Sequence, residues 1–388
     1  MNEIPLQGRH YLDWAATAIP LEIHPPAGSF AFGNPSSAHR EGREAREALE
    51  NARSRCAAVL QVLPENLYFT SGGTESNALV LHSQLLRNPK RSLLCSGIEH
   101  PSVRENCLIL KKMGFTHGVI GVEKDGRVSE KTLAKALEKH DDSGFCAVMG
   151  VNNEIGSIMD LEALVSLTRF YASKTHRPVH FHSDLVQALG KVPLDITGWD
   201  LDSASFSAHK LGGPRGIGLL YLKKPLESFY AGGEQEMGIR PGTENTQGAL
   251  FMADLLECRA KAETVMTEAE KARKRFKYLI SELRKIKCCI LIPECRDDED
   301  ERFSPWIVQV RFRNVPGAVM VRALDNEGIA VSTGSACSSS SQERPVLASM
   351  GLDESARLEG LRISQGWTTD KPDIDALISG IKNALSFL

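Results

Sequence analysis

The segment Ser205-Phe206-Ser207-Ala208-His209-Lys210-Leu211-Gly212-Gly213-Pro214 places a lysine between a strand-like run and a loop too rich in glycine to continue as a helix. A primary amine displayed at the end of a strand can condense with an aldehyde. Most lysines beside glycines are solvated loop residues, and the segment by itself leaves that alternative open. The choice depends on what the rest of the chain brings to Lys210.

Strand-like and helix-like segments alternate on both sides of this lysine. The strand candidates are Leu67 to Thr70, Arg91 to Cys95, Thr116 to Val122, Cys146 to Val151, Pro178 to His182, Asp202 to Phe206 and Ile217 to Leu222. The helix candidates are Ser37 to Leu60, Glu75 to Leu86, Glu130 to Lys139 and Leu161 to Lys174. This alternation predicts an α/β fold in which a mostly parallel sheet is covered on both faces.

The chain changes character near residue 257. A long, heavily charged helical stretch from Glu257 to Lys287 precedes an acidic run, Arg296 to Arg302, which we interpret as an exposed loop. A chain of 388 residues fits two domains at about 150 residues each. We predict a large domain of residues 15–256 and a smaller α+β domain of residues 1–14 and 257–388. The elements expected in the smaller domain are strands Trp306 to Phe312 and Leu361 to Ser364 and helices Ala318 to Glu327 and Lys371 to Leu388.

The composition argues against several classes of protein. A formal net charge of -3 is unlike that of a nucleic-acid-binding protein or a protein of anionic membrane surfaces. No window approaches the roughly 18 apolar residues of a membrane span, and Met1 to Gly8 lacks the pattern of a signal peptide. Nine cysteines without paired CxxC units indicate neither a disulfide framework nor a structural zinc site. We therefore expect a cytoplasmic enzyme with a small ligand and no metal.

Gly72-Gly73-Thr74 joins a strand candidate to a helix candidate. Backbone N–H groups and a threonine hydroxyl at a helix N-terminus can bind a phosphate. The alternative is an ordinary glycine turn with a capping threonine, because the segment has neither the lysine of a nucleotide P-loop nor a GxGxxG pattern. Ser207 and His209, just before Lys210, are further candidate phosphate donors.

Asp184 closely follows the strand candidate that ends at His182 and is therefore expected at the carboxyl edge of the sheet, where ligands bind in open α/β folds. A carboxylate there can keep a pyridine nitrogen protonated, so that the ring accepts electrons. The alternative role is an N-cap for the next turn. Gln187 is placed to donate to a phenolic oxygen on the same ring. A lysine, a phosphate loop and a carboxylate together indicate pyridoxal phosphate (PLP).

His100 and Cys337 are the remaining candidate catalytic residues. His100 precedes Pro101 at another strand end, and its alternative is a structural histidine. Cys337 lies among small polar residues, Ser332 to Ser341, where a thiol is accessible and its loop can move. The alternative is a flexible linker that contains a cysteine.

The chain resembles the cysteine desulfurases, the NifS/IscS-like members of the class V PLP-dependent aminotransferase family. The resemblance implies the PLP-dependent transferase fold (aspartate aminotransferase-like, fold type I). It rests on motifs that run in order through nearly the whole chain: Tyr11 to Thr17, Phe32 to Ser37, Thr70 to Ser76, Glu99-His100, Val151 to Gly156, Asp184 with Gln187, His209-Lys210, Arg240 to Thr243, Gly334 to Cys337 and Leu361-Arg362.

The resemblance also implies a role for each candidate residue. Lys210 would hold the cofactor covalently, Asp184 would pair with the pyridine nitrogen, Gln187 would contact the phenolic oxygen and His100 would stack on the ring. The phosphate would be held by Gly73, Thr74, Ser207 and His209, with Thr243 contributed by the second subunit of a homodimer. The substrate carboxylate would be bound by Asn153 and Arg362.

The implied reaction converts L-cysteine to L-alanine. Lys210 would remove the Cα proton, His100 would handle the thiol proton, and Cys337 would attack the substrate sulfur and become a persulfide. The sulfur would pass to an acceptor protein, a scaffold or a sulfurtransferase, for iron–sulfur cluster, thionucleoside or other thio-cofactor synthesis. The alternatives are a selenocysteine or cystine lyase, another class V transaminase, or a catalytically silent scaffold, which the presence of Lys210, Asp184 and Cys337 disfavours.

Three features depart from the family pattern. The segment from Pro20 to Phe32 is short and contains prolines, Trp14 is unusual in the first motif, and the chain ends at Leu388 soon after its last expected helix. We expect these differences to alter the entrance to the site and the docking of a scaffold protein. The length of the cysteine-bearing loop favours the group of desulfurases with a mobile loop.

Overall fold

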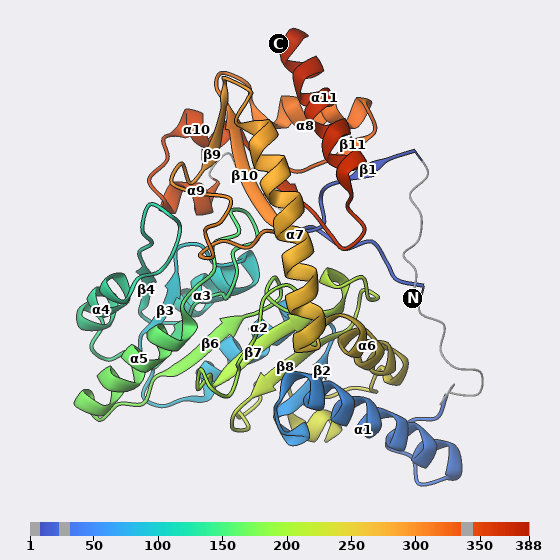
Figure 1. Cartoon of the computed structure of the whole chain (residues 1–388). Helices are drawn as coiled ribbons and strands as arrows, with labels where there is room; N and C mark the ends of the chain where they lie inside the picture. The colour runs from blue at the N-terminus through green and yellow to red at the C-terminus, as the bar shows by residue number, and fades with distance from the viewer. Residues whose placement is uncertain (1–7, 23–31, 335–343, 388) are drawn as a thin grey trace.

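A seven-stranded sheet lies at the centre of the larger part of the structure (Figure 1). The structure is a computed structural model, and it describes residues 8–22, 32–334 and 344–387. The strands, in their order across the sheet, are β2 (Leu67–Thr70), β8 (Gly218–Leu222), β7 (Ser203–Ser207), β6 (His180–Asp184), β5 (Phe145–Ala147), β3 (Leu93–Ser96) and β4 (His117–Ile120).

Six of these strands run in one direction. Each neighbouring pair from β7 to β4 is parallel, whereas β8 is antiparallel to both β7 and β2. Strand β2 therefore runs parallel to β7, and β8 alone is reversed. The carboxyl ends of β2, β3, β5, β6 and β7 consequently meet at one edge of the sheet.

Helices cover both faces of this sheet (Figure 1). The core on one face contains residues of α1 (Arg40–Leu60), α4 (Glu130–Lys139), α5 (Leu161–Thr175) and α6 (Thr246–Arg259). The core on the other face contains residues of α2 (Gly73–His82) and α3 (Pro101–Lys112). Successive strand residues alternate between the two cores, as Leu93 and Leu94 do, which explains why β2, β3, β5 and β8 are apolar along most of their length.

A second, smaller sheet has its own core. Its strands are β12 (Gly360–Ser364), β10 (Ile307–Phe312) and β9 (Cys289–Ile292), all antiparallel. Helices α7 (Ala262–Leu283), α8 (Gly317–Asn326) and α11 (Lys371–Phe387) pack on it. The remaining elements are the parallel pair β1 (His10–Tyr11) and β11 (Ile329–Ala330), short helices α9 (Pro345–Ser349) and α10 (Glu354–Leu358), and four 3-10 turns, η1 (Pro64–Asn66), η2 (Ser83–Leu86), η3 (Ala208–Lys210) and η4 (Gln235–Gly238).

Two details of the predicted elements were wrong. The stretch predicted as one helix from Glu257 to Lys287 is divided, because α6 ends at Arg259 and α7 begins at Ala262. Arg296, taken as part of an exposed loop, is buried, and its guanidinium donates to the carbonyls of Ile155 (2.9 Å) and Ser304 (2.7 Å). Of the other charged residues of that loop, Asp298 and Asp300 are half-buried, and the remaining four are exposed, as predicted.

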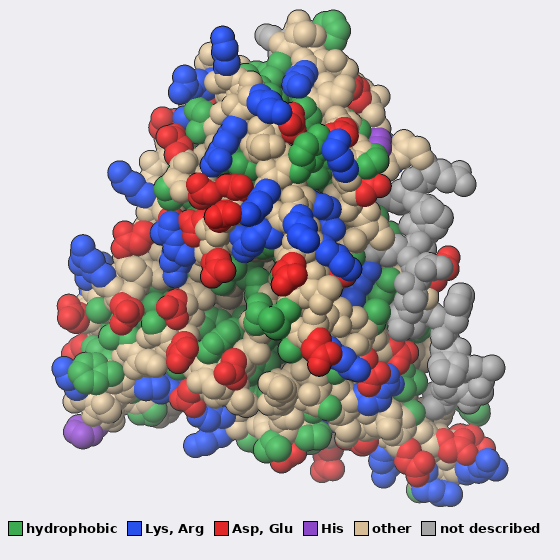
Figure 2. Space-filling model, in the orientation of Figure 1, with side chains coloured by type: hydrophobic (Ala, Val, Ile, Leu, Met, Phe, Trp, Pro, Cys, Tyr) green, Lys and Arg blue, Asp and Glu red, His purple; other side chains and the backbone are tan. Residues whose placement is uncertain are grey.

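Charges of both signs are interspersed on the face shown in Figure 2. Lysine and arginine side chains gather along α7, with acidic side chains beside them, for example in the ion pairs Lys271–Glu268 and Lys277–Glu299. This face therefore has no broad surface of one sign. None of the described helices is long and apolar enough to cross a membrane.

Trp14, the unusual residue of the first motif, is buried between the two sheets. Its ring packs edge-on against Trp367, and its Nε1 donates to the Tyr11 carbonyl at 2.9 Å. A Cβ at Gly366 would lie 1.9 Å from the Trp14 ring. A tryptophan thus fits here because residue 366 has no side chain.

Gly366→Ala should destabilise the protein by about 1–3 kcal/mol, the usual effect of overpacking a core. Gly121→Ala is the matched control, because a Cβ there meets no atom within 4 Å and Gly121 does not have a positive φ. Denaturant unfolding of both variants is the measurement. Equal stability of the two would contradict the tight packing at Trp14.

Candidate active site

The carboxyl edge of the large sheet gathers most of the candidate residues. Lys210 follows β7 through the single turn η3, Asp184 is the last residue of β6, and the Gly72-Gly73-Thr74 turn follows β2. His100 lies four residues beyond the end of β3. Because these strands are parallel, the topology brings to one edge residues that lie far apart in the sequence.

Lys210 is half-buried and contacts the N-terminal segment. Its Nζ donates to the carbonyls of Ala15 (2.7 Å) and Ala16 (2.6 Å). No local sequence pattern predicts these partners beyond the general match of residues 11–17 to the family motif. The amine that would bind a cofactor is therefore positioned by backbone carbonyls from a distant part of the chain.

Asp184 is buried and held by two donors. Its Oδ2 accepts from Asn77 Nδ2 at 2.8 Å, and its Oδ1 accepts from the Val186 backbone N–H at 3.0 Å. Asn77 is held in turn by His182, whose Nε2 lies 2.9 Å from the Asn77 Oδ1. Burial lowers the pKa of His182 to about 3, so the neutral ring can donate from Nε2. Sequence reasoning missed Asn77 and His182, which together orient the carboxylate.

His100 caps α3. Its Nδ1 accepts from the Ser102 backbone N–H at 3.1 Å, and burial lowers its pKa, although nearby Asp184 opposes that shift. The adjacent Glu99 is also buried, and burial raises its pKa to about 7. A neutral histidine with Nδ1 engaged as an acceptor carries its proton at Nε2. That nitrogen can exchange a proton with a substrate.

The turn after β2 fits a phosphate. Gly72 has a φ of 149°, a value that favours glycine, and no side chain caps α2, so the first backbone N–H groups of the helix are available to an anion. A Cβ at Gly73 would lie 2.6 Å from a Val186 methyl group and one at Gly72 would lie 3.5 Å from Ser207 Oγ. The Thr74 side chain is exposed. The residues present therefore fit the phosphate of PLP.

His209 and Gln187 complete the residues predicted to hold the cofactor. His209 Nδ1 lies 2.9 Å from the Thr17 hydroxyl, and burial, followed by the nearby Lys210 charge, lowers the His209 pKa to about 4. The buried Gln187 donates from Nε2 to the Ala15 carbonyl at 2.8 Å. That carbonyl also accepts from Lys210, so Gln187 and Lys210 share one acceptor.

Arg362, the predicted carboxylate-binding residue, is buried. It pairs with Asp13 (Nη2 to Oδ1, 2.8 Å) and donates from Nη1 to the Asn153 carbonyl at 2.8 Å. Its Nε has no partner among the described residues. The structure thus brings Arg362 and Asn153 together, and it adds Asp13, which the sequence did not single out. A substrate carboxylate would have to share the guanidinium with Asp13.

One predicted residue, Thr243, is not part of this group. Thr243 is exposed on the loop between η4 and α6. Cys337 lies outside the described residues. The described residue closest to it on the N-terminal side, Gly334, has its carbonyl 3.4 Å from Arg362 Nη1. Gly334 therefore lies beside the predicted carboxylate site.

A separate group of possible metal ligands lies in the core under α3. One atom each from Cys95, Cys107 and His117 lie within 4.8 Å of one another. The Cys95 Sγ to His117 Nε2 distance is 3.0 Å. Two ligands of a tetrahedral zinc ion would lie about 3.5 Å apart. The short distance and the lack of a fourth metal-ligating side chain in this described group indicate hydrogen-bonded core residues.

The aminotransferase class-V family model matches residues 10–377. The chain belongs to this family. The chain is 34% identical to a curated protein, the cysteine desulfurase IscS of Dictyoglomus turgidum, over 97% of this chain and 95% of that protein. It is 35% identical to the putative cysteine desulfurase IscS 1 of Bacillus subtilis, over 92% of this chain and 93% of that protein.

Solved structures of class-V proteins share the fold. A NifS-like protein superposes with a TM-score of 0.86 at 31% identity, covering 98% of this chain and 100% of that one. A NifS-like protein from Rickettsia africae gives 0.82 at 27%, covering 97% and 99%. The predicted PLP-dependent transferase fold of type I is confirmed, and PLP is the cofactor of this class-V enzyme, as the sequence predicted.

Proposed function

We propose that the protein is a PLP-dependent cysteine desulfurase that converts L-cysteine to L-alanine and transfers the sulfur through Cys337. The observation that supports this most is the convergence of Lys210, Asp184 and the Gly72-Gly73-Thr74 turn at one sheet edge. Curated relatives over nearly the whole chain are named cysteine desulfurases. One solved relative is SspA in complex with cysteine, whose structure superposes on this chain with a TM-score of 0.75.

PLP, when bound, supplies an electron-accepting ring that acidifies the substrate Cα–H and accepts the electron pair released at carbon. We assign the groups around it from their positions at the sheet edge. Lys210 would bind it covalently, Asp184 would face its pyridine nitrogen, and the N-terminus of α2 with Thr74, Ser207 and His209 would hold its phosphate. Asn77 keeps the Asp184 carboxylate in place through the 2.8 Å hydrogen bond.

Proton transfers fall to Lys210 and His100. Once the substrate amine replaces it, the Lys210 amine is free to take the Cα proton. His100 is neutral because burial lowers its pKa, and it would handle the thiol proton of the substrate. To accept that proton at Nε2, the ring must take the Nδ1–H tautomer, in which Nδ1 faces the Ser102 hydroxyl at 2.8 Å. Arg362 and Asn153 would orient the substrate carboxylate, with Asp13 as the competing anion on Arg362.

The sulfur transfer needs no reactant other than L-cysteine and the Cys337 thiolate. The Cys337 thiolate attacks the substrate sulfur, an S–S bond forms, and the substrate C–S bond breaks. The electron pair of that bond stays with the carbon skeleton, which takes up protons and leaves as L-alanine. The sulfur remains on Cys337 as a persulfide, which a sulfur-acceptor protein then takes up, for use in iron–sulfur cluster assembly among other routes.

Three further assignments belong to this proposal. Thr243 is exposed, as a residue that reaches the site of a second subunit in a homodimer must be. The eight described cysteines are free thiols, which suits the reducing cytoplasm. The two cores support a division into a large domain, 15–256, and a small domain, 1–14 with 257–388.

The competing activities are separable by product analysis. We expect L-alanine from L-cysteine, with Cys337 required. A selenocysteine or cystine lyase would act on those substrates in preference to cysteine, and a transaminase would convert an added keto acid to its amino acid. Measuring alanine release from the three amino acids, and amino-group transfer to pyruvate, distinguishes them.

Asp184→Ala should lower turnover of L-cysteine by about 10²–10³-fold, because it removes the charge opposite the pyridine nitrogen. PLP should still bind, since Lys210 and the phosphate cradle are unchanged. The matched control is Asp141→Ala, which changes an exposed aspartate far from the sheet edge. Alanine production by Asp184→Ala at the rate of the control would contradict the assigned role.

A further inference from the structure

Lys191 is a buried lysine that the proposed reaction does not use. It is the one lysine among the described residues that is fully buried, with 2% of its surface exposed. Burial, and then the nearby cations Lys210, Arg362 and Arg259, lower its pKa to about 7. Burying a lysine costs free energy unless the amine has a specific partner. The contacts of Lys191 therefore indicate what the buried amine does.

The backbone of Lys191 is fixed by both parts of the protein. Its N–H donates to the Ala188 carbonyl at 3.0 Å, in the turn that follows β6. Its carbonyl accepts from Trp306 Nε1 at 3.0 Å, just before β10 of the smaller sheet. The backbone of Lys191 is therefore held in place on both sides, so the position of the amine depends only on the conformation of the side chain.

The amine ends on Gln187. Lys191 Nζ donates to Gln187 Oε1 at 3.1 Å, and both side chains are buried. Charged or neutral, the Lys191 amine has N–H groups to donate, and the amide oxygen of Gln187 faces it as the acceptor. The amide nitrogen then faces the opposite side, where it donates to the Ala15 carbonyl at 2.8 Å.

A continuous chain of hydrogen bonds thus runs from Lys191 through Gln187 and the Ala15 carbonyl to Lys210. The Gln187 amide nitrogen has two hydrogens, and the Ala15 carbonyl uses one. The second remains for the phenolic oxygen of PLP. Without Lys191 the buried Oε1 would lose its donor, and the amide would turn or shift to recover one.

We propose that Lys191 is a positioning residue of the cofactor site, which holds the Gln187 amide so that its N–H points at the phenolic oxygen of PLP. This inference rests on the proposed function, because Gln187 is assigned to that oxygen there. A donor on the phenolic oxygen disfavours protonation of the cofactor–lysine linkage. Lys191 therefore helps to set the pH at which the bound cofactor changes colour.

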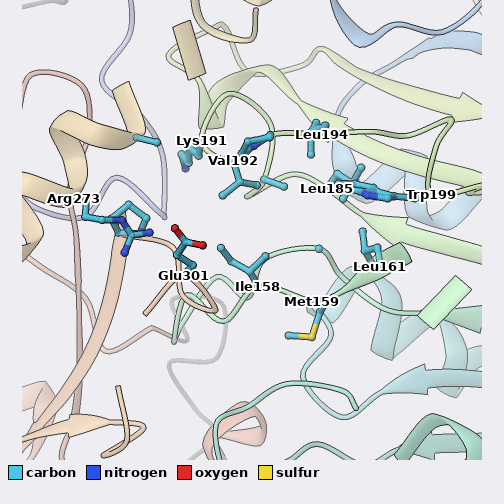
Figure 3. A pocket seen from close by; sticks show the side chains of 15 residues that line it. Ile158, Met159, Leu161, Leu185, Lys191, Val192, Leu194, Trp199, Arg273 and Glu301 are labelled. Atoms are coloured by element: carbon cyan, nitrogen blue, oxygen red, sulfur yellow. The ribbon is translucent and has the colours of Figure 1, made fainter. Parts of the chain in front are cut away.

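The surroundings of Lys191 allow a clean substitution. Lys191 lines a cavity of about 380 Å³. In the view of Figure 3 it lies toward the same end as Val192, Arg273 and Glu301, while Leu185 and Trp199 line the other end. Methionine has nearly the shape of the lysine stem and no hydrogen-bond donor. Lys191→Met should therefore fold, with the loss of a buried amine offsetting the loss of the donor to Gln187.

The experiment is a pH titration of the cofactor absorbance in four holoenzymes: wild type, Lys191→Met, Gln187→Ala and the double variant. We expect Lys191→Met to raise the spectral midpoint by about one pH unit, a tenfold change in proton affinity. We also expect it to weaken PLP binding to cofactor-free protein about tenfold. In the Gln187→Ala background the same substitution should add almost nothing, because its partner is gone.

Two results would overturn the inference. One is an unchanged midpoint in Lys191→Met. The other is a full shift that persists in the Gln187→Ala background, which would assign the effect to the charge of Lys191 acting directly on the cofactor. Failure of the proposed function is a separate outcome, since in that case wild-type protein would not hold PLP on Lys210 at all.

Discussion

Lys210→Ala should lower alanine production from L-cysteine by about 10⁴-fold or more, as loss of a covalent catalytic group does in other enzymes. The lysine has two roles in the account, covalent attachment of PLP and removal of the Cα proton, so the substitution removes both. Alanine release in a fixed-time assay with added PLP is the measurement.

Borohydride reduction gives a second readout for the same residue. In wild-type protein it should fix PLP on Lys210, and a peptide map should find the adduct there. Lys124→Ala, which changes an exposed lysine, serves as the control for activity. An adduct on another lysine, or activity of Lys210→Ala near that of the control, would contradict the assignment.

Cys337→Ala should abolish alanine accumulation while leaving the cofactor in place, a loss of about 10⁴-fold or more in turnover. The residues that would hold PLP lie elsewhere in the sequence, so the absorbance should still respond to added L-cysteine. Attack requires the thiolate of Cys337. Without it the substrate C–S bond has no nucleophile.

Alkylation of wild-type protein should reproduce this defect. The experiment needs a control for a second thiol that the reagent can reach. Cys295 is exposed and will react as well. Cys295→Ala should therefore keep full activity and full sensitivity to the reagent. Desulfuration by Cys337→Ala at the wild-type rate would show that Cys337 has no catalytic role, and it would favour a simple PLP lyase.

The sheet was predictable because its strands carry a strong local signal. The runs that became β2 and β8 are short and mostly apolar, whereas those that became β6 and β7 alternate apolar with polar residues. The structure places each of the four within two residues of its predicted bounds. Asp184 and Lys210 follow from this, since a residue at a strand end is positioned by the strand. The parallel arrangement then brings them to one edge.

Other elements were missed because their signal is weak or tertiary. Strand β9 follows a charged helix, α7, without a turn motif and pairs only with β10, so Cys289 to Ile292 did not stand out. Helix α3 begins at the histidine–proline pair His100-Pro101, which was interpreted as a strand end. In the active site, Ala15 and Asn77 act through contacts with residues distant in the sequence, which no local pattern reveals.

Mass spectrometry after a single turnover tests the central claim most directly. Protein loaded with PLP and given one equivalent of L-cysteine should release one L-alanine per subunit and carry one additional sulfur atom on the peptide that contains Cys337. Mild reduction should remove that sulfur. Alanine formed without added mass on that peptide, or release of free sulfide with pyruvate and ammonia, would contradict a cysteine desulfurase that acts through Cys337.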